Sequence, residues 1–182
     1  LSLTRVVAID QLSAADSGRT VGPKAAKLAE LRKHYPEAVS RGLAIPFGVF
    51  KAVVLDQAYP GGGTLFEWMQ GEYRNLEKLP AGSAAQKQAV ERFRAELYQR
   101  ILDTQLSEAF KSDLRQALAR TFGGEQIGLF VRSDTNVEDL AGFTGAGLNL
   151  TLPNVVDFDE LLESITRVWA SPFTSRAFSW RQ

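Results

Sequence analysis

Apolar residues recur every three or four positions through the middle of the chain, which predicts a block of three helices. The first two begin at capping-box patterns, Thr64 with Glu67 and Ser83 with Gln86. We expect their apolar stripes to form core rather than a cofactor site. The stripe residues are Leu65, Trp68, Met69, Leu76, Leu79, Val90, Phe93, Leu97, Ile101, Phe110, Leu114, Ala117 and Leu118.

Short apolar runs on both sides of this block predict strands. Residues 6–9 are interpreted as a first or edge strand, and residues 43–50 as a strand that Pro46 and Gly48 interrupt before a short helix at 51–57. Residues 127–131 carry no charge and are interpreted as a short buried strand, although periodicity alone does not distinguish this from a buried helical turn. Residues 148–152 alternate as a strand does, and Pro153 ends the pattern.

Further helices are expected near both ends of the chain. One of about four turns begins at Pro23, a residue suited to the first helical position, with Ala25, Leu28, Leu31 and the nearby Ala29 on its apolar side. Another begins at residue 157 or 159, and a last one follows residues 171–172. Together these elements predict an α+β fold, a mixed sheet with helices.

The composition excludes several classes of function. Lysines and arginines number 21, as do aspartates and glutamates, so the net charge is zero and no basic stripe indicates a nucleic-acid partner. No apolar run reaches transmembrane length and no signal-peptide pattern opens the chain, so we expect no membrane partner. Cysteine is absent, which excludes disulfides and thiolate chemistry and favours a cytoplasmic location.

The two ends of the sequence suggest a piece of a longer protein. The chain begins without Met and stops within a helix-like pattern at residues 173–182. A length of 182 residues suffices for one domain with a core, or for one lobe of a larger domain. We therefore expect residues 1–182 to form a single lobe of a longer multidomain chain.

The stretch 131–150, VRSDTNVEDLAGFTGAGLNL, has the character of a binding site. Arg132 and Ser133 follow the predicted strand, and three glycines then occur within six residues, Gly142, Gly145 and Gly147. A cation at a strand end followed by a glycine loop with free backbone amides suits a polyanion such as a nucleotide phosphate. The alternative is that Arg132 forms a structural ion pair with an acid at 138 or 139.

A second phosphate-binding feature is Lys24, on the first turn of the helix that begins at Pro23. The positive end of the helix dipole, the free amides and a flexible ammonium favour a phosphate there, although many such lysines are merely solvated. The glycine loop matches neither a Walker A nor a dinucleotide pattern. His34 is interpreted as a solvated residue at a helix end, and no metal-ligand spacing is found.

Four segments together resemble one known family. Residues 21–31, VGPKAAKLAEL, and 45–50, IPFGVF, are similar to the start of the nucleotide-binding domain of phosphoenolpyruvate synthase and pyruvate phosphate dikinase, where the patterns are close to V-G-G-K-A-A-N-L and V-P-x-G-F. Residues 131–155 resemble that domain's V-R-S-S-x-x-x-E-D-L and glycine loop, and residues 168–178 its V-W-A-S-x-x-x-x-R-A. Several of these forms resemble the plant-type glucan, water dikinases more closely still.

The resemblance implies the first lobe of an ATP-grasp-type domain, with ATP held between two lobes. It implies that ATP passes its β-phosphate to a histidine on a separate domain, which delivers it to pyruvate or another acceptor. Lys24 and Arg132 match the catalytic cations on the nucleotide phosphates. The remaining nucleotide contacts that it implies are Ser133 and the loop residues Gly142, Thr144, Gly145 and Gly147.

Other parts of the machinery are expected beyond residue 182. These are the Mg²⁺ ligands, the second ATP-grasp lobe and the phosphohistidine domain. This chain also departs from the family pattern at three positions. Pro23 replaces a glycine and removes a backbone donor, Lys27 stands for an asparagine, and Asp134 for a serine. We expect the Asp134 carboxylate to compete with phosphate for Arg132.

Two alternatives to a pyruvate-linked dikinase stay open. The acceptor of a relative can be glucan or an antibiotic, because acceptor specificity lies outside this lobe. The chain can also be a non-catalytic, degenerate nucleotide-binding or regulatory module, an interpretation that Pro23 and Asp134 favour.

Overall fold

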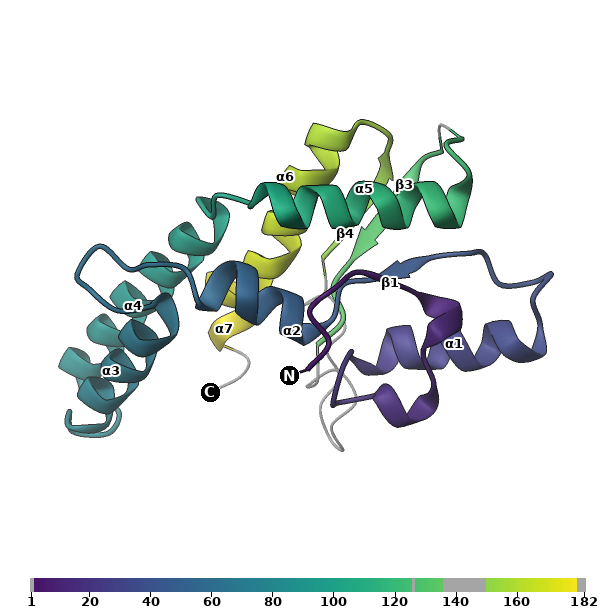
Figure 1. Cartoon of the computed structure of the whole chain (residues 1–182). Coiled ribbons are helices and arrows are strands. Elements are labelled where there is room, and N and C mark those ends of the chain that lie inside the picture. Colours follow the sequence, from purple (N-terminus) through teal and green to yellow (C-terminus); the bar gives the residue numbers. More distant parts are fainter. Residues whose placement is uncertain (1, 126, 136–149, 180–182) are drawn as a thin grey trace.

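The computed structural model describes residues 2–125, 127–135 and 150–179. Helix α1 (Pro23–His34) lies at one side of the molecule, and α3 (Leu65–Glu77) and α4 (Ala84–Leu102) lie at the other (Figure 1). Between them are α5 (Glu108–Phe122), α6 (Phe158–Ala170), β3 (Leu129–Arg132) and β4 (Thr151–Val155).

Short elements connect these longer ones. Strands β1 (Val7–Ala8) and β2 (Leu43–Ala44) flank α1 in the sequence, and α2 (Phe47–Phe50) continues into a π-helical turn, Lys51–Leu55. The remaining described elements are α7 (Ser175–Ser179) and the 3-10 turns Ile9–Gln11, Ala14–Asp16 and Ser171–Phe173. The predicted strand at 43–50 is thus wrong in its second half, because Pro46 precedes α2 and has no amide for a strand partner.

The strands form two separate antiparallel sheets of two strands each. Val7 pairs with Ala44 in the first sheet, and Val131 pairs with Leu152 in the second. The predicted combination of strands with helices is confirmed, but the described residues do not join their strands into one mixed sheet. Each strand of the β1–β2 ladder has two residues, because the chain turns into a 3-10 helix at Ile9 and meets Pro46 soon after β2.

Strand β4 differs from its prediction by running through Pro153. The register of the β3–β4 pair shifts between Leu129 and Val131, and Asn154 adopts a left-handed φ of 55°. Such an irregularity is where a proline can enter a strand, because a ladder hydrogen bond is already missing there. The sequence pattern places the end of this strand too early for that reason.

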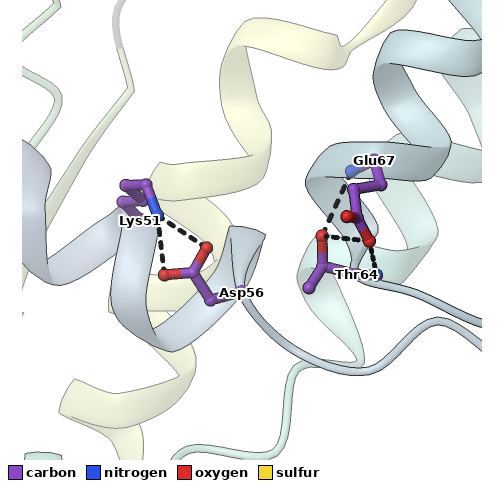
Figure 2. Close-up of polar contacts among 4 residues, drawn as sticks. All are labelled: Lys51, Asp56, Thr64 and Glu67. Carbon is purple, nitrogen blue, oxygen red and sulfur yellow. Dashed lines mark hydrogen bonds and ion pairs between the residues drawn. The ribbon is translucent and has the colours of Figure 1, made fainter.

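The helical block begins at the caps that the sequence predicts. Thr64 and Glu67 form a complete capping box, with the Glu67 amide donating to Thr64 Oγ1 (3.2 Å) and the Thr64 amide to Glu67 Oε2 (2.8 Å; Figure 2). Nearby, the Lys51 ammonium pairs with Asp56 at 2.7 Å (Figure 2). At α4 only half of the predicted box forms, since Ser83 Oγ accepts from the Gln86 amide but the Gln86 side chain accepts from Gly82.

The stripe residues of α3, α4 and α5 build two of the three hydrophobic clusters. One is centred on Phe93, Leu97 and Ile101 of α4, and the other on Phe110 and Leu114 of α5, where α5 and α6 pack against β3 and β4. The predicted core role of these stripes is confirmed. Trp169 of α6 packs against both clusters, with its ring centroid 5.6 Å from Phe50 and 5.9 Å from Phe110.

The prediction for the buried side of α1 is confirmed for Ala29 but wrong for the two leucines. Ala26 and Ala29 are buried, at 2% and 0% exposure, whereas Leu28 and Leu31 are 39% and 48% exposed. Alanines let the helix axis approach the adjacent 3-10 turns closely, in a small cluster with Leu12, Val21 and Ala44. Helix α1 has 12 residues, or slightly over three turns, rather than the four expected.

Strand β3 is only half-buried, in contrast to the predicted buried strand. Leu129 and Val131 pack against the α5–α6 cluster, but Phe130 is 67% exposed and Arg132 is exposed as well. Side chains alternate between the two faces of a strand, so Phe130 and Arg132 share the open face of this sheet.

Among the described residues, no helix has the length and apolar character needed to cross a membrane.

The different burial of Leu97 in α4 and Leu31 in α1 predicts that replacement by alanine lowers the free energy of unfolding by unequal amounts. Leu97→Ala should lower the free energy of unfolding by about 2–5 kcal/mol, because it empties a fully buried site. Leu31→Ala should change it by less than about 0.5 kcal/mol, because that side chain is half-exposed on α1. Urea denaturation of both variants measures the difference. Equal losses would show that Leu31 lies in the core.

Candidate functional site

The end of β3 meets the N-terminus of α1, and Asp134 makes the junction. The Lys24 amide donates to Asp134 Oδ1 at 2.9 Å, and the Ala25 amide donates to Asp134 Oδ2 at 3.2 Å. These amides belong to the first turn of a helix, where backbone N–H groups lack partners inside the helix. Asp134 therefore caps α1 from a position 110 residues further along the chain.

Gly22 makes room for this cap. It is the N-cap residue of α1, and no side chain of its own bonds the first turn. A Cβ atom at position 22 would lie 2.3 Å from Asp134 Oδ1 and 2.8 Å from the Asp134 carbonyl carbon. The absence of a side chain at Gly22 is thus a steric requirement of the contact between the two segments.

Lys24 reaches the same junction with its side chain. Its ammonium donates to the carbonyl oxygen of Ser133 at 3.2 Å. The Ser133 amide in turn donates to the carbonyl oxygen of Leu150 at 3.0 Å, which continues the β3–β4 pairing by one residue. The ammonium is therefore held next to the residue that follows Arg132, so two cations that are 108 positions apart in the sequence belong to one region.

Arg132 ends β3 and is exposed. In the part of the chain that the structure describes, no hydrogen bond or ion pair joins its guanidinium to another side chain. Residues 138 and 139, the acids of the alternative ion pair, lie outside the described residues. An exposed, planar guanidinium with five N–H donors is well suited to phosphate oxygens.

Ser133 lies on the opposite face of the strand from Arg132 and is 4% exposed. Its hydroxyl oxygen is buried and has no hydrogen-bond partner in the described structure. A buried hydroxyl without a partner costs free energy, so a polar group that reached it would gain a hydrogen bond. Because the Ser133 hydroxyl and the Arg132 guanidinium lie on opposite faces of the strand, one ligand could contact both only at the end of the strand.

Several predicted positions cannot be placed in this geometry. The loop residues Gly142, Thr144, Gly145 and Gly147 lie outside the described residues. His34 is exposed in the last turn of α1, at the opposite end of the helix from Lys24. Within residues 2–125, 127–135 and 150–179, no cluster of three His, Asp or Glu side chains is arranged to hold a metal ion.

The structural role of Asp134 was missed by the sequence pattern and corrects one expectation. The expected free amides at the start of α1 are bonded to Asp134, so they are not open to a phosphate. The expected competition with phosphate at Arg132 stays a prediction. The signal was Gly22, because a helix whose N-cap residue has no side chain needs an acceptor from elsewhere.

Comparison with known proteins gives one consistent family. The sequence pattern described as pyruvate phosphate dikinase, AMP/ATP-binding domain, matches residues 18–182. A rifampicin phosphotransferase from a Streptomyces species is 32% identical over 161 residues, which are 88% of this chain and 17% of that protein.

Two phosphoenolpyruvate synthases are also similar. The one from Neisseria meningitidis serogroup B is 29% identical over 164 residues, covering 88% of this chain and 20% of the synthase. The one from Pseudomonas aeruginosa is 28% identical over 177 residues, covering 97% of this chain and 21% of the synthase. The chain thus spans about a fifth of the length of these relatives.

The junction predicts that Gly22 and Asp134 stabilise the fold through one shared contact. Asp134→Ala should lower the free energy of unfolding by about 1–2 kcal/mol through loss of the helix cap. Gly22→Ala should also be destabilising, because its Cβ displaces the carboxylate. The double variant should cost less than the two single losses added together, since the second change removes a contact already lost. Urea denaturation measures all three.

Gly71→Ala is the matched control. Gly71 lies within α3, and a Cβ atom there meets nothing within 4 Å. Alanine favours a helix by up to about 1 kcal/mol over glycine, so this variant should be more stable than the original chain. Strict additivity of Gly22→Ala and Asp134→Ala would contradict the shared contact.

Proposed function

We infer that this chain, which belongs to the pyruvate phosphate dikinase AMP/ATP-binding domain family, binds ATP as the first lobe of an ATP-grasp-type domain. The whole of residues 1–182 forms that lobe. It would serve a dikinase-type phosphotransferase, in which ATP gives a phosphoryl group to a histidine on a separate domain. That histidine then passes the group to pyruvate or to another acceptor.

The observation that carries this proposal is the meeting of two cations at one strand end. Lys24 is held there by its bond to the Ser133 carbonyl oxygen, and Arg132 projects from the last residue of β3. A transferring phosphoryl group carries negative charge on its oxygens, and fixed cations stabilise that charge. We assign both residues to the nucleotide phosphates as catalytic groups.

The other nucleotide contacts are assigned by the same argument and by position. The buried Ser133 hydroxyl has a hydrogen bond to gain from a ligand at the strand end. Gly142, Thr144, Gly145 and Gly147 belong to the glycine loop that follows, whose amides suit phosphate oxygens. Mg²⁺ would be held mainly by residues beyond this chain, in the second lobe.

The proposal leaves the final acceptor to other parts of the protein. A rifampicin phosphotransferase and phosphoenolpyruvate synthases match this chain to a similar degree, so this lobe is common to different acceptors. Pyruvate, an antibiotic and glucan are each compatible with it. A second candidate, a nucleotide-binding or regulatory module without catalysis, is supported by one observation, the carboxylate of Asp134 at the start of α1.

The lobe alone should bind Mg-ATP weakly and transfer no phosphate. Without the second lobe, we expect a dissociation constant no better than about 1 mM, near −4 kcal/mol, in an NMR titration of the 182-residue chain. Lys24→Ala should weaken this binding further by removing a phosphate contact. Lys33→Ala is the control, because Lys33 lies on the same helix but pairs with Glu30 at an exposed site. Micromolar binding by the isolated lobe, or equal effects of the two variants, would contradict the proposal.

In the longer protein that contains this lobe, Arg132→Ala should abolish phosphorylation of the acceptor histidine. The fold should be unaffected, because the side chain is exposed. Radiolabelled ATP measures the phosphohistidine, and circular dichroism measures the fold. Arg120→Ala, an exposed arginine at the end of α5, should leave phosphorylation unchanged. An active Arg132→Ala protein would assign the arginine a structural role.

A further inference from the structure

We propose that the Asp134 carboxylate occupies the anion-binding position at the start of α1 and thereby determines which groups a phosphate can contact there. Nucleotide phosphates then contact the side chains of Lys24 and Arg132 but not the backbone amides of α1. Asp134 is thus a specificity-determining residue that weakens phosphate binding. This inference rests on the proposed function, because it concerns the same site.

A full account of the first helical turn supports this assignment. Pro23 has no N–H group, the amides of Lys24 and Ala25 donate to the two Asp134 oxygens, and the Ala26 amide donates to the Gly22 carbonyl at 3.4 Å. From Pro23 to Ala26, therefore, each residue either has no backbone N–H group or already donates it in a hydrogen bond. A phosphate could bond these amides only by displacing the carboxylate.

The packing around the carboxylate shows that it is built in. Asp134 is half-buried, and Gly22 leaves the space in which Oδ1 lies, since any Cβ there would approach to 2.3 Å. The buried hydroxyl of Ser133, which has no hydrogen-bond partner among the described residues, lies at the same junction and could bond a polar ligand there. The phosphate position is thus shifted from the helix axis towards the Lys24 ammonium and the end of β3.

The carboxylate also acts through its charge. A negative group bonded to the Lys24 and Ala25 amides repels an incoming phosphate, and the repulsion is strong where solvent is partly excluded. At position 134 the family often has serine, which carries no charge. Asp134→Ser should therefore both free the Lys24 and Ala25 amides and remove the repulsion.

Asp134→Ser and Asp134→Asn separate these two effects in an NMR titration with inorganic phosphate. Asp134→Ser should bind phosphate at least about fivefold more tightly than the original chain, and the Lys24 and Ala25 amide signals should then shift with phosphate. Asp134→Asn loses the charge but keeps one oxygen acceptor, so it should show a smaller gain. In the original chain those two amides should not respond. Asp103→Ser, which removes an exposed acid after α4, is the control and should bind as the original chain does.

The outcomes decide between this inference and the proposed function. If neither Asp134 variant binds phosphate more tightly, or if the Lys24 and Ala25 amides respond in the original chain, the carboxylate does not exclude phosphate from the helix and the inference is wrong. Asp134→Asn keeps the test decisive if Asp134→Ser does not fold, which thermal melting monitors. Equal effects of Lys24→Ala and Lys33→Ala on Mg-ATP binding, with tighter phosphate binding by Asp134→Ser, would refute only the proposed function.

Discussion

The contact between Asp134 and the first turn of α1 is the constraint on which the candidate site depends. It joins two segments that are 110 residues apart, and it requires both a glycine at position 22 and a carboxylate at 134. At the same junction, the Lys24 ammonium donates to the Ser133 carbonyl oxygen next to the end of β3.

The rest of the fold supports that junction. Helices α5 and α6 pack against one face of β3 and β4, and Trp169 connects this cluster with the one around α4. The strand that presents Arg132 is thereby anchored on its apolar face, while its other face stays open with Phe130 and Arg132. Helix α1 is anchored separately, through alanines that permit close packing against the 3-10 turns.

The family membership and the geometry address different questions. The match over residues 18–182 shows that this is an AMP/ATP-binding domain of the pyruvate phosphate dikinase type. The structure shows the charged groups at the place where we assign the phosphates: the Asp134 carboxylate bonds the start of α1, and the Lys24 ammonium bonds the residue that follows Arg132. The chain spans about a fifth of the length of these relatives.

Local signals in the sequence determined the helical block, its caps at Thr64, Ser83 and Asp157, and the candidate cations Lys24 and Arg132. Such features depend on neighbours three or four positions away, which a linear pattern contains. Only the tertiary structure decided which side of α1 is buried, that β4 passes through Pro153, and that Asp134 caps α1. These outcomes depend on which segments meet in space, and alternation or helical spacing carries no information about a partner 110 residues away.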